Sequence, residues 1–140
     1  MDLVIQKSVE LGITSLQPVL TQFTPLSYSQ EVLDKKEKHW KSIIISACEQ
    51  SGRNIIPKLK NTQPFREIIK MQRNANKIIL DQKAAQKFKD ISVKHSLGFC
   101  VLIGPEGGFS EDESCYAIKN GFMPVTMGNS VLRTDTAGIA

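Results

Sequence analysis

The 140-residue chain lacks several features that mark common classes of protein. No apolar run approaches the ~18 residues of a membrane span, and charged side chains occur within the first ten residues, so we expect neither a membrane helix nor a signal peptide. Cys48, Cys100 and Cys115 are odd in number and widely spaced, which predicts neither a disulfide framework nor a zinc site. The only histidines are His39 and His95. We therefore expect no metal site and a cytoplasmic location.

Two signatures of nucleotide binding are also missing from the glycine-rich residues 104–108, Gly-Pro-Glu-Gly-Gly. No Lys-Ser/Thr pair follows them, and their spacing is not G-x-G-x-x-G. An ionised Glu106 would repel a phosphate, so a neutral or cationic ligand is favoured. Three glycines can adopt positive φ and let a ligand approach closely. A structural turn without a ligand and a nucleotide-binding module remain the alternatives.

The surrounding residues predict a strand that leads into a helix. Residues 99–103 are a short apolar run, typical of a buried parallel strand. Ser110 and Glu113 have the spacing of a capping box, and Gly121 is placed to end a helix over residues 110–120. The glycine-rich residues should therefore lie at the carboxyl end of a strand, where α/β sheets bind ligands.

Strand and helix patterns alternate along the rest of the chain. We expect helices at residues 2–11, 30–51, 64–71 and 84–90 and helical turns from residue 134, with strands at residues 16–20, 55–59, 77–81 and 124–127. In the 30–51 helix the apolar stripe includes Trp40, which predicts a core position for it, and Gly52 closes the helix. The alternation predicts one α/β domain with a mostly parallel sheet.

Charge is distributed unevenly. Residues 33–60 contain seven basic and three acidic residues, a balance of +4, whereas residues 103–140 contain two basic and five acidic residues, a balance of −3. A basic element apart from a more acidic pocket favours a polyanionic partner and a separate small ligand. An ordinary solvated helix face is the alternative interpretation of the basic stretch.

Four segments together resemble one family. They are residues 6–12, QKSVELG; residues 47–53, ACEQSGR; residues 103–108, IGPEGG; and residues 131–137, VLRTDTA. With these motifs, essentially the whole chain resembles the ribosomal RNA small-subunit methyltransferase E family. Its members are SPOUT-class RNA methyltransferases that methylate N3 of a uridine in small-subunit ribosomal RNA with S-adenosylmethionine (SAM). The resemblance implies a carboxyl-terminal trefoil knot in the α/β fold and a homodimer.

The resemblance also implies the site residues. Cofactor contacts are expected from Leu80, Ile103, Gly104, Pro105, Glu106, Gly107, Gly108, Met127, Gly128, Val131 and Leu132. Arg133 is the candidate catalytic residue, because its guanidinium can stabilise the anion that forms when uridine N3 loses its proton. A salt bridge from Arg133 to Asp135 or Glu106 is the structural alternative. Arg53, Lys41 and Lys38 are candidate RNA contacts.

The chain departs from the family pattern at both ends. Family members carry an amino-terminal RNA-binding domain, and they continue beyond the position of Ala140. We therefore expect residues 1–140 to be a partial SPOUT methyltransferase domain. The alternative function is an inactive remnant that binds the cofactor or RNA without turnover.

Overall fold

A computed structural model describes residues 1–24, 28–72, 75–94, 96–128, 130 and 132–140 of the chain. The chain forms two compact units. The first comprises Met1–Leu20, Pro25–Gln63 and Ile139, and the second comprises Thr21–Thr24, Pro64–Gly138 and Ala140. The single domain expected from the sequence thus contains two separate clusters of packing.

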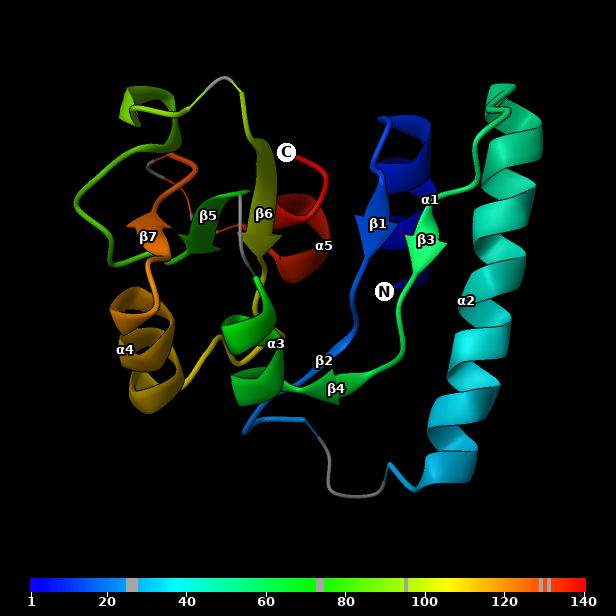
Figure 1. The fold of residues 1–140 in the computed structure, drawn as a ribbon, viewed down its shortest axis with the longest axis horizontal. Helices are drawn as coiled ribbons and strands as arrows, with labels where there is room; N and C mark the ends of the chain where they lie inside the picture. Colours follow the sequence, from blue (N-terminus) through cyan, green and yellow to red (C-terminus); the bar gives the residue numbers. More distant parts are fainter. Residues whose placement is uncertain (25–27, 73–74, 95, 129, 131) are drawn as a thin grey trace. The chain divides into compact units, whose positions relative to one another are not determined.

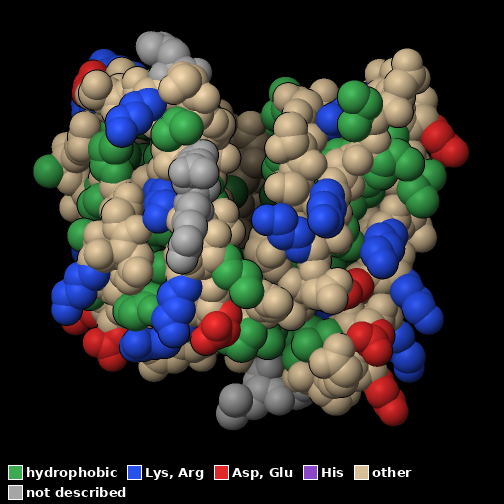
Figure 2. All heavy atoms as spheres, viewed as in Figure 1, with side chains coloured by type: hydrophobic (Ala, Val, Ile, Leu, Met, Phe, Trp, Pro, Cys, Tyr) green, Lys and Arg blue, Asp and Glu red, His purple; other side chains and the backbone are tan. Residues whose placement is uncertain are grey.

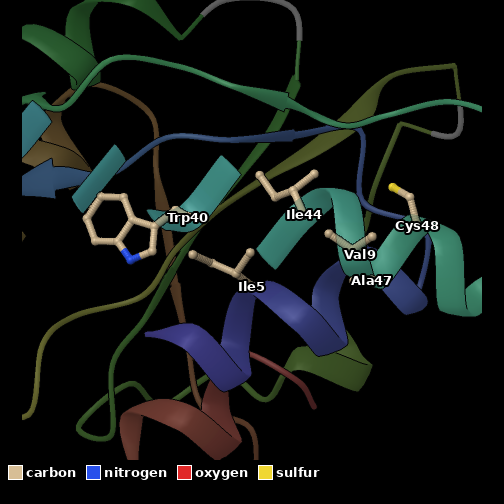
Figure 3. Packing of buried hydrophobic residues seen from close by; sticks show 6 residues of the cluster. All are labelled: Ile5, Val9, Trp40, Ile44, Ala47 and Cys48. Carbon is tan, nitrogen blue, oxygen red and sulfur yellow. The ribbon is translucent and has the colours of Figure 1, made fainter. Parts of the chain in front are cut away.

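Two helices that lie side by side form most of the first unit (Figure 1): α1 (Asp2–Glu10) and α2 (Gln30–Ser51). Their apolar faces meet in a core made of Ile5, Val9, Trp40, Ile44, Ala47 and Cys48 (Figure 3). Trp40 is only 8% exposed, which confirms its predicted core position. Gly52 ends α2 with φ 69°, so the predicted end of this helix is also confirmed.

Short strands complete the first unit. β1 (Ser15–Leu16) pairs in parallel with β3 (Lys58–Leu59), and β2 (Val19–Leu20) pairs with β4 (Gln63–Pro64). The strand predicted at residues 16–20 is interrupted at Gln17 and Pro18, because proline has no N–H to give to a ladder. The strand predicted at residues 55–59 keeps only its last two residues.

A three-stranded parallel sheet is the centre of the second unit. Its strands are β5 (Ala75–Leu80), β6 (Gly98–Leu102) and β7 (Met123–Val125), in the order β6-β5-β7 (Figure 1). This pairing confirms the predicted α/β class with parallel strands. The central strand is the most deeply buried, with Ile78 and Ile79 at 0% exposure. The burial predicted for the 99–103 strand is wrong, because β6 lies at the edge of the sheet and Phe99 is 55% exposed. Other core residues of the unit are Phe65, Ile68, Ile69, Leu102, Ala117, Phe122 and Val125.

Helices α3 (Phe65–Met71) and α4 (Glu111–Lys119) pack against each other, with the Arg66 guanidinium 4.6 Å from the centre of the Tyr116 ring. The capping box at the start of α4 is confirmed: the Glu113 N–H donates to Ser110 Oγ at 3.2 Å, and the Ser110 N–H donates to Glu113 Oε2 at 3.0 Å. Close to the end of the chain, α5 (Thr134–Ala137) supplies the helical turns expected there.

The helix predicted at residues 84–90 is wrong. Only a 3₁₀ turn, η1 (Phe88–Asp90), forms in that segment. The backbone next to it pairs with Thr126 instead: the Thr126 N–H donates to the Gln86 carbonyl, and the Phe88 N–H donates to the Thr126 carbonyl, both at 2.9 Å. Local helix propensity is overridden here by pairing with a residue distant in sequence.

Candidate functional site

Loops that follow the three parallel strands of the second unit border a cavity of about 640 Å³. One loop follows β5, one follows β6 and one follows β7. Parallel strands end at the same edge of a sheet, so segments far apart in sequence are brought together there. The cavity therefore lies where the sequence predicted a ligand site.

Most of the predicted cofactor residues line this cavity. The nine that do are Leu80, Ile103, Gly104, Pro105, Glu106, Gly107, Gly108, Met127 and Leu132. Gly128 is not among the lining residues, and Val131 lies outside the described residues. The candidate catalytic residue, Arg133, also lines the cavity. The structure thus brings these residues together, whereas their contact with a cofactor remains a prediction.

The glycine loop, residues 103–109, is a tight turn after β6. The Gly108 N–H donates to the Pro105 carbonyl at 2.8 Å. Of the three glycines, only Gly108 uses the positive φ that glycine permits, with a value of 73°. Gly104 is needed for another reason: a Cβ there would be 3.1 Å from two backbone atoms of Gly108. A side chain at position 104 would therefore require the Gly108 backbone to move by a few tenths of an ångström.

The loop after β7 brings Arg133 to the cavity. Gly128 has a φ of 139°, and its carbonyl accepts a hydrogen bond from Thr126 Oγ1 at 3.0 Å. Arg133 directly precedes α5, where its carbonyl accepts the Ala137 N–H at 2.8 Å. Its side chain is exposed, and within the described part of the chain it forms no ion pair with Glu106. The salt bridge to Glu106, one form of its structural alternative, is therefore not present there.

Sequence reasoning missed the loop after β5. Asp81, Gln82 and Lys83 line the cavity, and the Lys83 N–H donates to Asp81 Oδ1 at 2.9 Å. The signal was available, because a strand was predicted to end at residue 81 and ligands bind at such ends. Other lining residues missed from the sequence are Phe109, Ser114, Val125, Thr126, Ser130, Thr134 and Ala137.

The charged lining is weakly acidic. Three carboxylates, Asp81, Glu106 and Asp135, stand against two cations, Lys83 and Arg133. The rest of the wall combines apolar side chains such as Leu80 and Met127 with glycine backbone. Such a wall suits a ligand that has an apolar ring, polar groups for the backbone and no phosphate.

The candidate RNA contacts are in the first unit. Lys38 and Lys41 are exposed on α2, and Figure 2 shows basic side chains along the amino-terminal half of this helix, with acidic ones near both of its ends. Arg53 is half-buried, and its Nη1 donates to the Val9 carbonyl at 2.7 Å, which ties the end of α2 to α1. Part of the Arg53 guanidinium is therefore already used within the fold.

Among the residues that the structure describes, no group of three or more His, Cys, Asp or Glu side chains is placed to hold a metal ion. His39 Nε2 lies 2.7 Å from Asp2 Oδ2, and His95 is outside the described residues. No described helix is both long and apolar enough to cross a bilayer.

Residues 1–140 match the family model of the RNA methyltransferase domain. The chain belongs to this family. A curated relative, the ribosomal RNA small subunit methyltransferase E of Buchnera aphidicola subsp. Schizaphis graminum, is 38% identical over 143 residues. That alignment covers 100% of this chain and 57% of the relative. The chain therefore spans little more than half the length of such relatives.

Solved structures agree with this membership. The ribosomal RNA small subunit methyltransferase E of Neisseria gonorrhoeae, bound to SAM, is 41% identical and superposes with a TM-score of 0.87. The alignment covers 99% of this chain and 56% of the Neisseria protein. A Legionella pneumophila protein described as a methyltransferase, in complex with SAM, is 37% identical with a TM-score of 0.93. That alignment covers 99% of this chain and 57% of the Legionella protein.

Proposed function

We propose that residues 1–140 are a partial SPOUT methyltransferase domain of an enzyme that uses SAM to methylate N3 of a uridine in small-subunit ribosomal RNA. The observation that carries the proposal is the cavity at the carboxyl ends of β5, β6 and β7. Two relatives of 37% and 41% identity across 99% of the chain were solved with SAM, which supports the choice of ligand.

The residues of the cavity fit SAM. Its volume of about 640 Å³ lies within the range of roughly 300–1,000 Å³ that small-molecule sites occupy. Apolar Leu80, Ile103 and Met127 can cover the adenosine, and the open backbone of residues 104–108 can bond its polar groups. The acidic balance of the lining suits a sulfonium and disfavours the phosphates that the rival nucleotide-binding function needs. Gly128, Val131 and Leu132 are proposed to complete the site.

When bound, SAM supplies the methyl group. The chain must promote the loss of the N3 proton, because the neutral imide nitrogen is a poor nucleophile. Arg133 is proposed to donate to the uracil carbonyl oxygens and thereby to stabilise the resulting anion. Glu106 and Asp135 belong to the same cavity lining. Either carboxylate can receive the N3 proton when the uracil lies within hydrogen-bond distance of it.

Further proposals concern partners and topology. Lys38 and Lys41, exposed on α2, and Arg53 are proposed to contact RNA phosphates, which position the substrate without specifying its sequence. The family resemblance supports a homodimer, a trefoil knot in the carboxyl-terminal part and action in the cytoplasm, where ribosomal RNA is modified.

A chimera tests the proposed reaction. In it, this chain replaces the aligned 57% of the Buchnera relative, and the product is incubated with SAM and small ribosomal subunits that lack the modification. Mass spectrometry of the nucleosides should detect N3-methyluridine. A chimera that binds both SAM and the subunit but forms no N3-methyluridine would contradict the proposal.

The second candidate is a remnant that binds the cofactor or RNA without turnover. It is the alternative that the sequence left open. An assay of the 140-residue chain alone, beside the chimera, separates the enzyme from the remnant. If the chain binds the cofactor without forming product and the chimera forms product, the activity requires the part of the relative that this chain does not cover. Absence of product from both would favour the remnant.

A further inference from the structure

Phe23, far from the glycine loop in sequence, lies beside Gly107. Thr21–Thr24, here named the clamp segment, belongs to the second unit by its contacts. The Phe23 ring faces Gly107 on the side where a side chain would project. A Cβ at position 107 would be 3.6 Å from the Cγ and Cδ2 atoms of Phe23. The ring thus leaves room there for little more than a methyl group.

A single carboxylate anchors the clamp segment to the start of α4. Glu113 Oε1 accepts the Gln22 N–H at 2.8 Å, while Glu113 Oε2 accepts the Ser110 N–H at 3.0 Å. Hydrogen bonds to an ionised acceptor are stronger than neutral ones. The capping box that begins the helix after the glycine loop therefore also fixes the residue before Phe23.

A turn within the clamp segment also restrains the backbone of Phe23. The Thr24 N–H donates to the Thr21 carbonyl at 3.0 Å, and the Thr21 N–H donates to Thr24 Oγ1 at 2.9 Å. Phe23 lies inside this four-residue turn, so its backbone has little freedom. The turn therefore fixes the backbone from which the Phe23 ring projects toward Gly107.

The glycine loop has few hydrogen bonds of its own. Within the part of the chain that the structure describes, one backbone hydrogen bond closes this turn, from the Gly108 N–H to the Pro105 carbonyl, and Glu106 and Gly107 between them are exposed. A short turn with few buried contacts opens at low free energy. The same residues line the cavity, so opening of the turn alters the surface that a ligand meets.

We propose that Phe23 is a positioning residue that holds the glycine loop in its ligand-binding shape. The identity of the ligand, SAM, rests on the proposed function, whereas the support of the loop by Phe23 does not. Phe23 is 52% exposed, so the contact is one-sided and the ring contributes little to the core. Its removal is therefore expected to loosen the loop without unfolding the unit.

Amide hydrogen exchange in the ligand-free, nitrogen-15-labelled chain tests the proposal. Phe23→Ala should speed the exchange of the Gly108 amide by about fivefold or more, because the turn opens more often. Phe23→Leu, which keeps an apolar contact, should restore most of the protection. The matched control is Phe99→Ala, since Phe99 is 55% exposed on β6 and does not line the cavity; it should leave Gly108 unchanged.

Titration with S-adenosylhomocysteine, the product form of the cofactor, supplies a second readout. Phe23→Ala should raise its Kd by about fivefold, and Phe99→Ala should not. Equal Gly108 exchange in the Phe23→Ala and Phe99→Ala variants would overturn the proposal. If the unmodified chain binds no S-adenosylhomocysteine, the proposed function fails while the exchange rates still decide whether Phe23 holds the loop.

Discussion

In the first unit a repeated pattern of apolar side chains on α1 and α2 builds the core, whereas in the second unit single residues in three loops shape the cavity. Ile5, Val9 and Ile44 each fill space between two helices, so another apolar side chain of similar volume could serve at each position. Gly104 and Gly108 are not, because one must lack a Cβ and the other must hold a positive φ. Stability is therefore expected to depend mainly on the apolar pattern of the helices, and ligand binding mainly on the identity of single loop residues.

Two neighbouring isoleucines in the first unit should give the largest effect. Ile44 is 2% exposed in the core, whereas Ile45 is 47% exposed on the same helix. Ile44→Ala should lower the free energy of unfolding by about 2–5 kcal/mol, because it removes buried methyl groups and leaves a cavity. Ile45→Ala should change it by less than about 1 kcal/mol. Denaturant titration measures the free energy of unfolding of both variants. Equal losses would show that Ile44 contributes no more to stability than the exposed Ile45.

Two glycines of the cavity loop should separate binding from stability. Gly104→Ala places a methyl 3.1 Å from the Gly108 backbone, so the loop must shift, and the Kd for S-adenosylhomocysteine should rise by roughly tenfold, or about 1.4 kcal/mol. Gly107→Ala meets only the Phe23 ring at 3.6 Å, an ordinary contact, and should keep the Kd within about twofold. Calorimetry of both variants decides, and equal Kd values would remove the special role of Gly104.

A pair of lysines tests the proposed RNA contact of the first unit. Replacing Lys38 and Lys41 by Gln should weaken binding to small-subunit ribosomal RNA and reduce the slope of log K against log salt by about 0.7–0.9 per lost contact. The control replaces Lys89 and Lys119, exposed in the second unit, and removes the same charge. Identical slopes in the two double variants would assign the effect to net charge alone.

The smallest effect is expected from Asp2 and His39 at the surface of the first unit. The hydrogen bond from His39 lowers the pKa of the Asp2 carboxyl below its ordinary value of 3.8, while its slight burial acts in the opposite direction. A lowered folded-state pKa stabilises the protein above pH 3.8, and this contribution is lost as pH falls through the folded-state value.

For an exposed pair the gain is under about 1 kcal/mol. Carbon NMR of the Asp2 carboxyl should give a pKa below 3.8, and His39→Gln should raise it. A value at or above 3.8 in the unmodified chain would show that the pair is not formed in solution.

Local signals predicted much of this fold. The bounds of α2, its end at Gly52 and the capping box of Ser110 and Glu113 all depend on residues within a few positions of each other. Parallel pairing followed from the alternation of strands and helices. The strand end at residue 103 was enough to predict the side of the sheet on which the cavity lies.

Features that depend on distant residues could not be predicted in this way. The segment at residues 84–90 is not a helix, because its backbone pairs with Thr126. Nothing near Phe23 in sequence indicates that it lies against Gly107, and nothing near Arg53 indicates a bond to the Val9 carbonyl. The φ values of the glycines also follow from the packing of the turn, which the sequence motif alone does not contain.

The most direct test of the central claim is calorimetric titration of the 140-residue chain with S-adenosylhomocysteine, with ATP as the competing ligand. We expect saturable binding of one S-adenosylhomocysteine per chain, with no comparable binding of ATP, because the net charge of the cavity lining is acidic. A folded chain that binds neither ligand, or that prefers ATP, would contradict the assignment of this cavity to SAM.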